Sequence, residues 1–98
     1  MVITATRNGN ELDLALRGRL DSSTAEELET LLDENTEGVE KVVLDLAELE
    51  FISSIGLRIL LKTDRKYAAM QGLHVKNVNE VVMDVFQLTG FDDILTLE

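Results

Sequence analysis

The side chains with the clearest chemical potential in this sequence are two adjacent serines, Ser53 and Ser54, with Gly56 two positions further on. A buried strand is predicted before the pair and a long helix after it, so the pair lies in a strand-to-helix turn. The first turn of a helix has backbone N–H groups without intrahelical partners and a partial positive charge. A hydroxyl there caps the helix, and a phosphate on that hydroxyl is stabilised by the same groups. Both interpretations, a pair of capping serines and a modification site, stay open on these residues alone.

The other reactive side chains form no recognisable constellation. The sequence has no cysteine and one histidine, His74, which we expect as a surface or edge residue of a strand rather than a catalytic base. The turn around Ser54 lacks the first glycine of the Gly-x-Ser-x-Gly elbow, but a small hydrolase using Ser54 is kept as an alternative. No Gly-rich phosphate loop is present. The carboxylates form a charge run without His or Cys, so neither a metal site nor a cofactor is predicted.

The charge of the chain is strongly acidic and unevenly distributed. The 98 residues, which we expect to form one domain over 1–98, include 19 acidic and 9 basic side chains, for a net charge of −10. The segment from Asp21 to Glu50 has Lys41 as its only basic residue. Such a surface repels phosphate backbones, so direct nucleic-acid binding is not expected. The sequence also begins without a signal-peptide pattern and has no apolar run long enough to span a bilayer, so we expect a cytoplasmic protein without membrane insertion.

The elements that must position the serines follow from periodicity and turn signals. Asn8-Gly9-Asn10 predicts a hairpin, Ser23 with Glu26 a capping box, Asn79 a helix cap and Gly90 a helix end. The predicted strands are 2–6, 11–17, 41–46, 73–78 and 94–97; the predicted helices are 24–33, 54–70 and 79–90, with 48–51 as a connection. This order predicts an α/β domain with a mixed, mostly parallel sheet, an antiparallel edge strand and about three helices.

Four segments, in the right order over about residues 11–95, resemble the STAS family (sulfate transporter and anti-sigma antagonist). The likeness is to its bacterial anti-sigma-factor antagonists in particular. Phe51 to Leu57 resembles the family's phosphorylation loop, Gly18 to Asp21 its Gly-x-Leu-Asp turn, Val43 to Leu46 its central strand, and Phe86 with Thr89-Gly90-Phe91 its closing helix. Within this match Ser54 stands at the serine that partner kinases phosphorylate. Ser53 replaces the usual aspartate and is a rival acceptor, and Ile55 replaces a small hydroxyl residue.

The resemblance implies a non-enzymatic switch. The unmodified protein would bind an anti-sigma factor with serine kinase activity and would be released when Ser54 is phosphorylated, and a phosphatase is a further candidate partner. Two alternatives remain open under the same resemblance. The chain could serve as an accessory subunit of a transporter or of a stress-sensing complex, and weak nucleotide binding at the helix start is compatible with it.

The expected docking surface combines two turns with the helix that follows the serines. Binding features of parallel α/β sheets gather at the carboxyl ends of the strands, where both turns lie. The residues expected on this surface are Asp21, Ser22, Ser23, Ser53, Ile55, Arg58 and Lys62. Leu57, Leu60, Leu61 and Ala68 are expected on the opposite, buried face of the helix. Gly56 is expected to have no packing role and to let a phosphate or another backbone approach closely.

Overall fold

The computed structural model describes residues 1–98 and contains five strands and four helices. In chain order these are β1 (Val2–Asn8), β2 (Glu11–Leu20), α1 (Ala25–Glu34), β3 (Lys41–Ile52), α2 (Ser54–Tyr67), β4 (Gly72–Lys76), α3 (Glu80–Thr89), α4 (Phe91–Ile94) and β5 (Thr96–Leu97). The sheet order is β1-β2-β3-β4-β5, in which only β1 and β2 are antiparallel. The predicted fold class is therefore confirmed.

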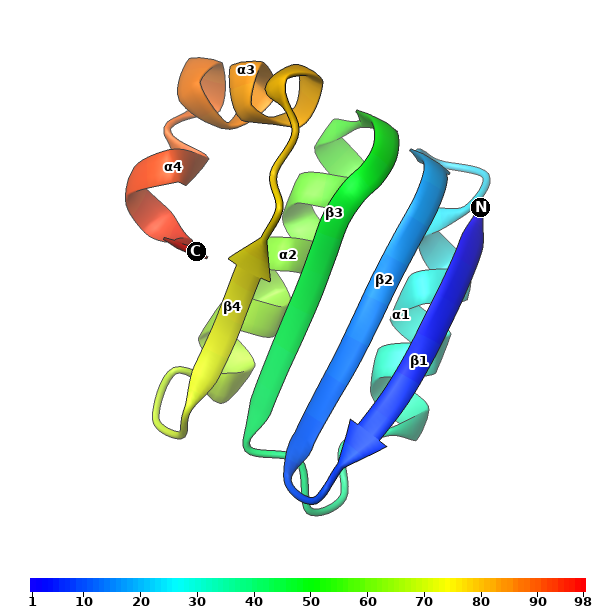
Figure 1. The fold of residues 1–98 in the computed structure, drawn as a ribbon, viewed down its shortest axis with the longest axis vertical. Coiled ribbons are helices and arrows are strands. Elements are labelled where there is room, and N and C mark those ends of the chain that lie inside the picture. Colours follow the sequence, from blue (N-terminus) through cyan, green and yellow to red (C-terminus); the bar gives the residue numbers. More distant parts are fainter.

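The helices cover one face of the sheet. Figure 1 shows α1 and α2 packed behind the strands, while α3 lies beyond the sheet near the end of β3. Leu12, Leu14 and Leu16 of β2 point to the helices and are fully buried, as their alternation predicts. Together with the inward side chains of β3, β4 and α1–α3 they form one contiguous hydrophobic cluster. None of the helices is long and apolar enough to cross a membrane.

The opening hairpin forms at the predicted place and is longer than predicted. Asn8 pairs with Glu11, which leaves a two-residue turn of Gly9 and Asn10, and Gly9 adopts a positive φ of 62°. This turn suits the right-handed twist of the two strands. β2 then continues to Leu20 instead of ending at residue 17, because its last residues pair with the far end of β3.

β3 differs most from the prediction, since residues 48–51 are strand rather than a connection. Its pairing with β2 shifts between Ala15 and Arg17 and again between Gly18 and Arg19, so β3 contains two extra residues. These bulges replace the period-2 pattern with buried residues at Leu46, Leu49 and Ile52, a spacing of three. That spacing is why the sequence did not indicate a strand there.

The Asn79 side chain satisfies the backbone of the bulged strand. Its Nδ2 atom donates to the carbonyl oxygens of Leu46, Ala47 and Leu49 at 3.1, 3.3 and 2.7 Å, and its Oδ1 atom accepts from the Val82 N–H at 3.0 Å. The predicted cap of α3 is thus confirmed. β4 pairs with β3 only as far as Asp45. The Asn79 side chain therefore joins α3 to carbonyl groups of β3 that β4 does not reach.

Several other element ends differ from prediction. α1 begins after Thr24 without a side-chain cap, so the capping box of Ser23 and Glu26 is wrong; Ser23 instead donates to Asp21. α2 ends at Tyr67, which is buried, whereas Ala68 is exposed. Thr89 of α3, expected to face inward from its helical spacing, is exposed. Within the expected last strand at 94–97, Thr96 and Leu97 form β5, whereas Ile94 is the last residue of the single-turn α4.

Candidate functional site

The Asp21 and Ser53 turns meet at the carboxyl ends of two neighbouring strands. Leu20 is the last residue of β2 and pairs with Ile52, the last residue of β3. The Ser53 N–H donates to the Leu20 carbonyl oxygen at 2.9 Å, which ties the second turn to the first. The strand ends therefore place the turn from Asp21 beside the turn from Ser53, as the sequence predicts.

The two serines have different surroundings at the start of α2. Ser53 is the N-cap, with extended backbone angles, and its Oγ accepts from the Gly56 N–H at 3.4 Å. Its carbonyl oxygen accepts the first helical bond, from the Leu57 N–H at 2.9 Å. Ser54 is the first helical residue, is exposed, and its hydroxyl makes no hydrogen bond within the protein. The N–H groups of Ser54 and Ile55 have no acceptor in the chain, and no acidic residue lies in this first turn.

Gly56 has a packing role, contrary to the expectation from the sequence. It is buried, and a Cβ atom at this position would lie 2.8 Å from Leu20 Cγ and 2.9 Å from Ile52 Cγ1. Leu20 Cγ is a branch point and Ile52 Cγ1 an inner methylene of core side chains, and neither can move away as a flexible chain end would. The glycine therefore lets α2 approach the ends of β2 and β3 closely, and it faces the core rather than a bound phosphate.

The Asp21 turn is held together by its own carboxylate. Asp21 Oδ1 accepts from the Ser23 hydroxyl at 2.7 Å and from the Ser23 N–H at 3.0 Å. These two bonds hold the pKa of the Asp21 carboxyl below its ordinary value, and the bond from the Ser23 hydroxyl has the larger effect. The Thr24 hydroxyl accepts from the Asp21 N–H at 3.0 Å and donates to the Arg19 carbonyl oxygen at 2.7 Å. Asp21 is thus a fixed negative charge beside the serine turn.

A groove of about 510 Å³ runs between α1 and α2 next to Ser54. Three residues of the expected docking surface, Ser22, Ile55 and Arg58, line it together with Ala25, Glu26, Glu29 and Ile59. Lys62 lies further along α2 and donates to Glu29 across the helices at 3.1 Å. Of the seven residues expected on the docking surface, three therefore line this groove. Asp21, Ser23 and Ser53 do not line it and use their polar groups within their own turns.

Sequence analysis missed four residues at this surface. Phe51 is 36% exposed at the end of β3, and the Arg19 guanidinium lies 4.2 Å from its ring centroid while its Nε is 3.6 Å from Asp21 Oδ2. The sequence did not predict Phe51 at this surface, because the two bulges change which face of β3 it occupies. Glu26 was expected only as the partner of Ser23 in a capping box and Glu29 only as part of the acidic run, although both line the groove between α1 and α2.

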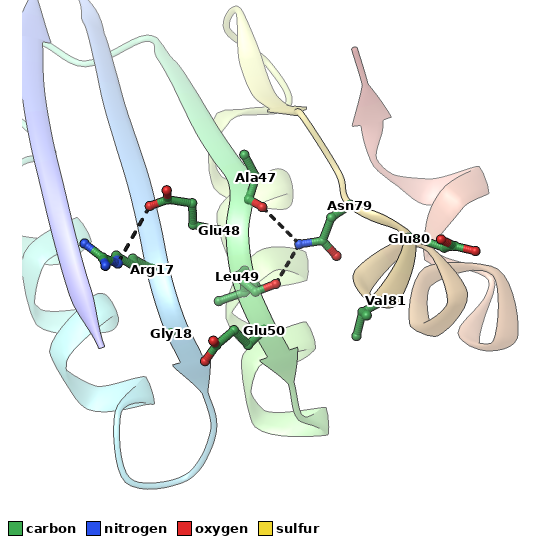
Figure 2. Close-up of a pocket in the computed structure, with 9 residues that line it drawn as sticks. All are labelled: Arg17, Gly18, Ala47, Glu48, Leu49, Glu50, Asn79, Glu80 and Val81. Atoms are coloured by element: carbon green, nitrogen blue, oxygen red, sulfur yellow. Dashed lines mark hydrogen bonds and ion pairs between the residues drawn. The ribbon is translucent and has the colours of Figure 1, made fainter.

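A second hollow, of about 650 Å³, lies at the bulged part of β3 and the start of α3 (Figure 2). It is lined by Arg17, Gly18, Ala47, Glu48, Leu49, Glu50, Asn79, Glu80 and Val81. Figure 2 shows Asn79 pointing at the β3 carbonyls and Arg17 pointing at Glu48, a pair 3.8 Å apart with both side chains exposed. The Asn79 amide in this hollow stabilises the bulged backbone, and none of the expected site residues lies here.

His74 is too far from Ser54 to act as its base. It pairs with Val43 near the beginning of β3, whereas Ser54 follows the end of that strand. At ~3.3 Å per residue the separation is on the order of 25–30 Å. The His74 ring contacts the Gln71 carbonyl oxygen at 2.9 Å and Glu98 Oε1 at 2.5 Å. No three His, Cys, Asp or Glu side chains are grouped so as to hold a metal ion.

Comparison with known proteins places this fold among described relatives. The family model described as "Mlab, STAS domain" matches residues 3–97. The protein BtrV of Bordetella bronchiseptica, named as a candidate anti-sigma factor antagonist, is 36% identical over 93 residues, which is 93% of this chain and 80% of BtrV.

Two solved structures of similar fold are those of SpoIIAA, described as an anti-sigma factor antagonist in its unphosphorylated form and as a Bacillus cell fate determinant in its phosphorylated form. The unphosphorylated form has a TM-score of 0.84 at 20% identity and covers 99% of this chain and 88% of its own. The phosphorylated form has a TM-score of 0.76 at 19% identity and covers 99% of this chain and 91% of its own.

Proposed function

The chain belongs to the STAS domain family, and on that premise we propose that it is an anti-sigma factor antagonist, switched by phosphorylation of Ser54. The unmodified protein binds an anti-sigma factor that has serine kinase activity, and the phosphorylated protein is released. Support for the antagonist role comes from the name of the 36% identical relative, and support for a phosphorylated state comes from the SpoIIAA structure in that form.

The observation that carries the proposal is the division of roles between the two serines. The Ser53 hydroxyl is engaged in capping, while the Ser54 hydroxyl is exposed and free of hydrogen bonds. A kinase therefore reaches Ser54 without breaking a bond of the fold. A phosphate on Ser54 would be near the free N–H groups of Ser54 and Ile55, which favour an anion. Arg58 lies four residues along the same helix and hence on the same side.

Phosphate acts on binding through charge at the edge of the groove. It adds about −1.5 to −2 charge next to Ile55, which is 44% exposed, and Arg58. A partner that buries Ile55 and pairs an acidic side chain with Arg58 would have to desolvate that phosphate and meet its repulsion, which is costly. Binding is thus lost although the fold is intact. This mechanism also explains why the contact surface and the modification site coincide.

The acceptor is identified by kinase treatment of the wild type, Ser54→Ala and Ser53→Ala, followed by mass spectrometry. We expect phosphate uptake by the wild type and by Ser53→Ala and none by Ser54→Ala. Equal uptake by Ser54→Ala would show that the acceptor is another residue. A serine-directed hydrolase probe on the same three proteins checks the alternative that Ser54 is a nucleophile, and we expect no labelling because His74 is remote.

The docking surface is tested by charge reversal on one helix. Arg58→Glu should weaken binding to the cognate anti-sigma factor by about tenfold or more, because it places an acid where the partner's acid pairs. Arg65→Glu, in the last turn of α2 and away from the groove, is the matched control. Ser54→Asp should also weaken binding. Gln87→Glu, which adds the same negative charge on the exposed side of α3, is its control and should bind like the wild type. If neither Arg58→Glu nor Ser54→Asp changes the affinity, the partner binds elsewhere.

Capture from the native host decides between the antagonist and an accessory subunit. We expect the wild type to retain an anti-sigma factor with kinase activity and Ser54→Asp to retain much less of it. Recovery of transporter subunits or of a large stress-sensing complex, insensitive to Ser54→Asp, would support the alternative family role instead.

A further inference from the structure

The free edge of β1 is an unused pairing surface in this fold. β1 is the first strand of the sheet order and pairs only with β2, and Figure 1 shows no strand beyond it. Beyond its ladder with β2, no backbone group of residues 2–8 bonds to another part of the chain. The seven-residue strand is longer than the usual ~5–6 residues, so the open row of backbone groups is also long.

The hairpin register identifies which groups face outward. Asn8 and Glu11 flank a two-residue turn and therefore form a hydrogen-bonded pair, and such pairs alternate along an antiparallel ladder. It follows that Val2, Thr4 and Thr6 bond to β2. The N–H and C=O groups of Ile3, Ala5 and Arg7 point away from the sheet.

Apart from Arg7, which pairs with the inward-facing Leu12 and so lies on the helix-facing side of the sheet, β1 lacks the usual protections of an edge strand. Natural edges carry lysine, proline, a bulge or an inward charge that prevents pairing. β1 has no lysine or proline, and the register irregularities lie between β2 and β3. Its only charged side chain, Arg7, donates to the carbonyl oxygens of Gly9 at 2.7 Å and Glu37 at 2.9 Å within its own chain. The edge is therefore available to another strand.

We propose that β1 pairs with β1 of a second copy of this chain, antiparallel about a two-fold axis at Ala5. In this register Ala5 faces Ala5 and Ile3 faces Arg7, so every outward N–H and C=O of Ile3, Ala5 and Arg7 finds a partner. Thr4 faces Thr6 of the other copy, which is a favourable cross-strand pair of β-branched residues. No like charges lie opposite each other, and the dimer has one continuous sheet across both copies.

Charge distribution favours a second copy at this edge over other places on the molecule. The first ten residues contain none of the 19 acidic side chains of the chain, so two copies meet where their repulsion is lowest. The contact is one strand wide and falls below the ~1,200 Å² of stable interfaces, so the dimer is weak and forms at high protein concentration. Because each copy has a net charge of −10, added salt should strengthen the dimer by screening long-range repulsion.

The test is sedimentation equilibrium of the purified chain over a wide concentration range at low and moderate NaCl. We expect a monomer–dimer equilibrium that shifts toward dimer with salt. Thr4→Lys/Thr6→Lys places like charges opposite each other and should weaken the dimer by about tenfold or more. Thr30→Lys/Gln87→Lys makes the same charge change at exposed helix positions and should dimerise like the wild type. Circular dichroism confirms that each variant is folded.

Ala5→Pro and amide exchange make the test specific to the edge. Proline at position 5 removes an outward N–H without costing β2 a hydrogen bond, so the monomer should fold and the dimer should be lost. In the wild type the N–H groups of Ile3, Ala5 and Arg7 should become protected from exchange as concentration rises, while those of Thr4 and Thr6 are protected throughout. A chain that stays monomeric at all concentrations, or a dimer indifferent to these β1 variants, overturns the proposal. The proposal is also overturned if the β1 edge pairs only with a different protein and not with a second copy of this chain.

Discussion

At the scale of single residues, the two serines of the α2 turn differ in what their hydroxyls do. Ser53 Oγ accepts from the Gly56 N–H, whereas the Ser54 hydroxyl makes no bond within the protein. A cap of this kind is typically worth ~0.5–2 kcal/mol, and the 3.4 Å bond length places it toward the weaker end.

The first prediction compares alanine substitutions at these two positions. Ser53→Ala should lower the free energy of unfolding by about 0.5–1 kcal/mol through loss of the cap. Ser54→Ala should change it by less than about 0.5 kcal/mol, because an exposed hydroxyl without a partner is removed. Urea unfolding followed by circular dichroism measures both. A larger loss for Ser54→Ala would mean that Ser54, not Ser53, caps the helix.

Asp21 gives the second prediction, which concerns pH. Because the folded pKa of this carboxyl is lowered, mainly by the Ser23 hydroxyl, the charged form stabilises the fold above the carboxyl's ordinary pKa. That contribution is lost as pH falls through the folded pKa. Ser23→Ala should raise the pKa of Asp21 toward its ordinary value, as followed by NMR titration. Asp21→Asn should be less stable than the wild type at neutral pH, and the difference should shrink below the ordinary pKa of the carboxyl and close as pH falls through its lowered folded pKa. An unchanged Asp21 pKa in Ser23→Ala would contradict this.

At the scale of elements, the contact of α2 with the ends of β2 and β3 determines where the serines lie. Gly56 allows this contact, since a Cβ atom there would be within 3.0 Å of Leu20 and Ile52. The close approach holds the first turn of α2 against the strand ends, beside the Asp21 turn. The position of Ser54 at the surface thus depends on a residue that faces away from it.

The third prediction is that Gly56→Ala destabilises the protein. Alanine improves helix propensity by about 1 kcal/mol, but overpacking against two branched core residues costs about 1–3 kcal/mol or more. We expect a net loss of about 1–2 kcal/mol in denaturant unfolding. On the Leu20→Ala background two of the three close contacts are gone, so the same substitution should cost less. A stabilised Gly56→Ala protein would show that α2 can move away from the strands at no cost.

At the scale of the whole molecule, Ser54, the proposed modification site, lies at the edge of the groove between α1 and α2 and outside the core. The buried cluster is formed by the inward faces of the sheet and helices, and Ser54 is not part of it. The acidic character of α1 and the basic residues of α2 meet across this groove, with Lys62 bonded to Glu29. A change of charge at Ser54 therefore alters a surface rather than the packing beneath it.

The fourth prediction is that phosphorylation leaves the fold intact. The start of α2 stabilises a nearby anion by roughly 0.3–1 kcal/mol, and repulsion from Asp21 opposes this, so the net change should be less than about 1 kcal/mol. Circular dichroism and thermal melting should be nearly the same for the phosphorylated and unmodified proteins, while partner binding differs strongly. A fall of many degrees in melting temperature would show that repulsion from Asp21 or another carboxylate dominates.

Local patterns in the sequence determined the elements and the position of the serine turn. The alternation of Leu12, Leu14 and Leu16, the Asn8-Gly9-Asn10 turn and the caps at Asn79 and Gly90 depend on near neighbours in the chain, and the structure confirms all of them. The gathering of Asp21 and Ser53 at one end of the sheet was also predictable, because parallel strands end at the same edge.

Only the tertiary structure decided features that depend on contacts between distant segments. The two bulges of β3 arise from its pairing with β2 and from the Asn79 amide 30 or more residues away, so residues 48–51 had no local strand pattern. Gly56 has a packing role only because Leu20 and Ile52 converge on it, and Glu29 lines the groove only because α1 packs beside α2. The opening hairpin predicted an antiparallel edge strand, but only the structure shows that β1 is that strand and that its outer side has no neighbour.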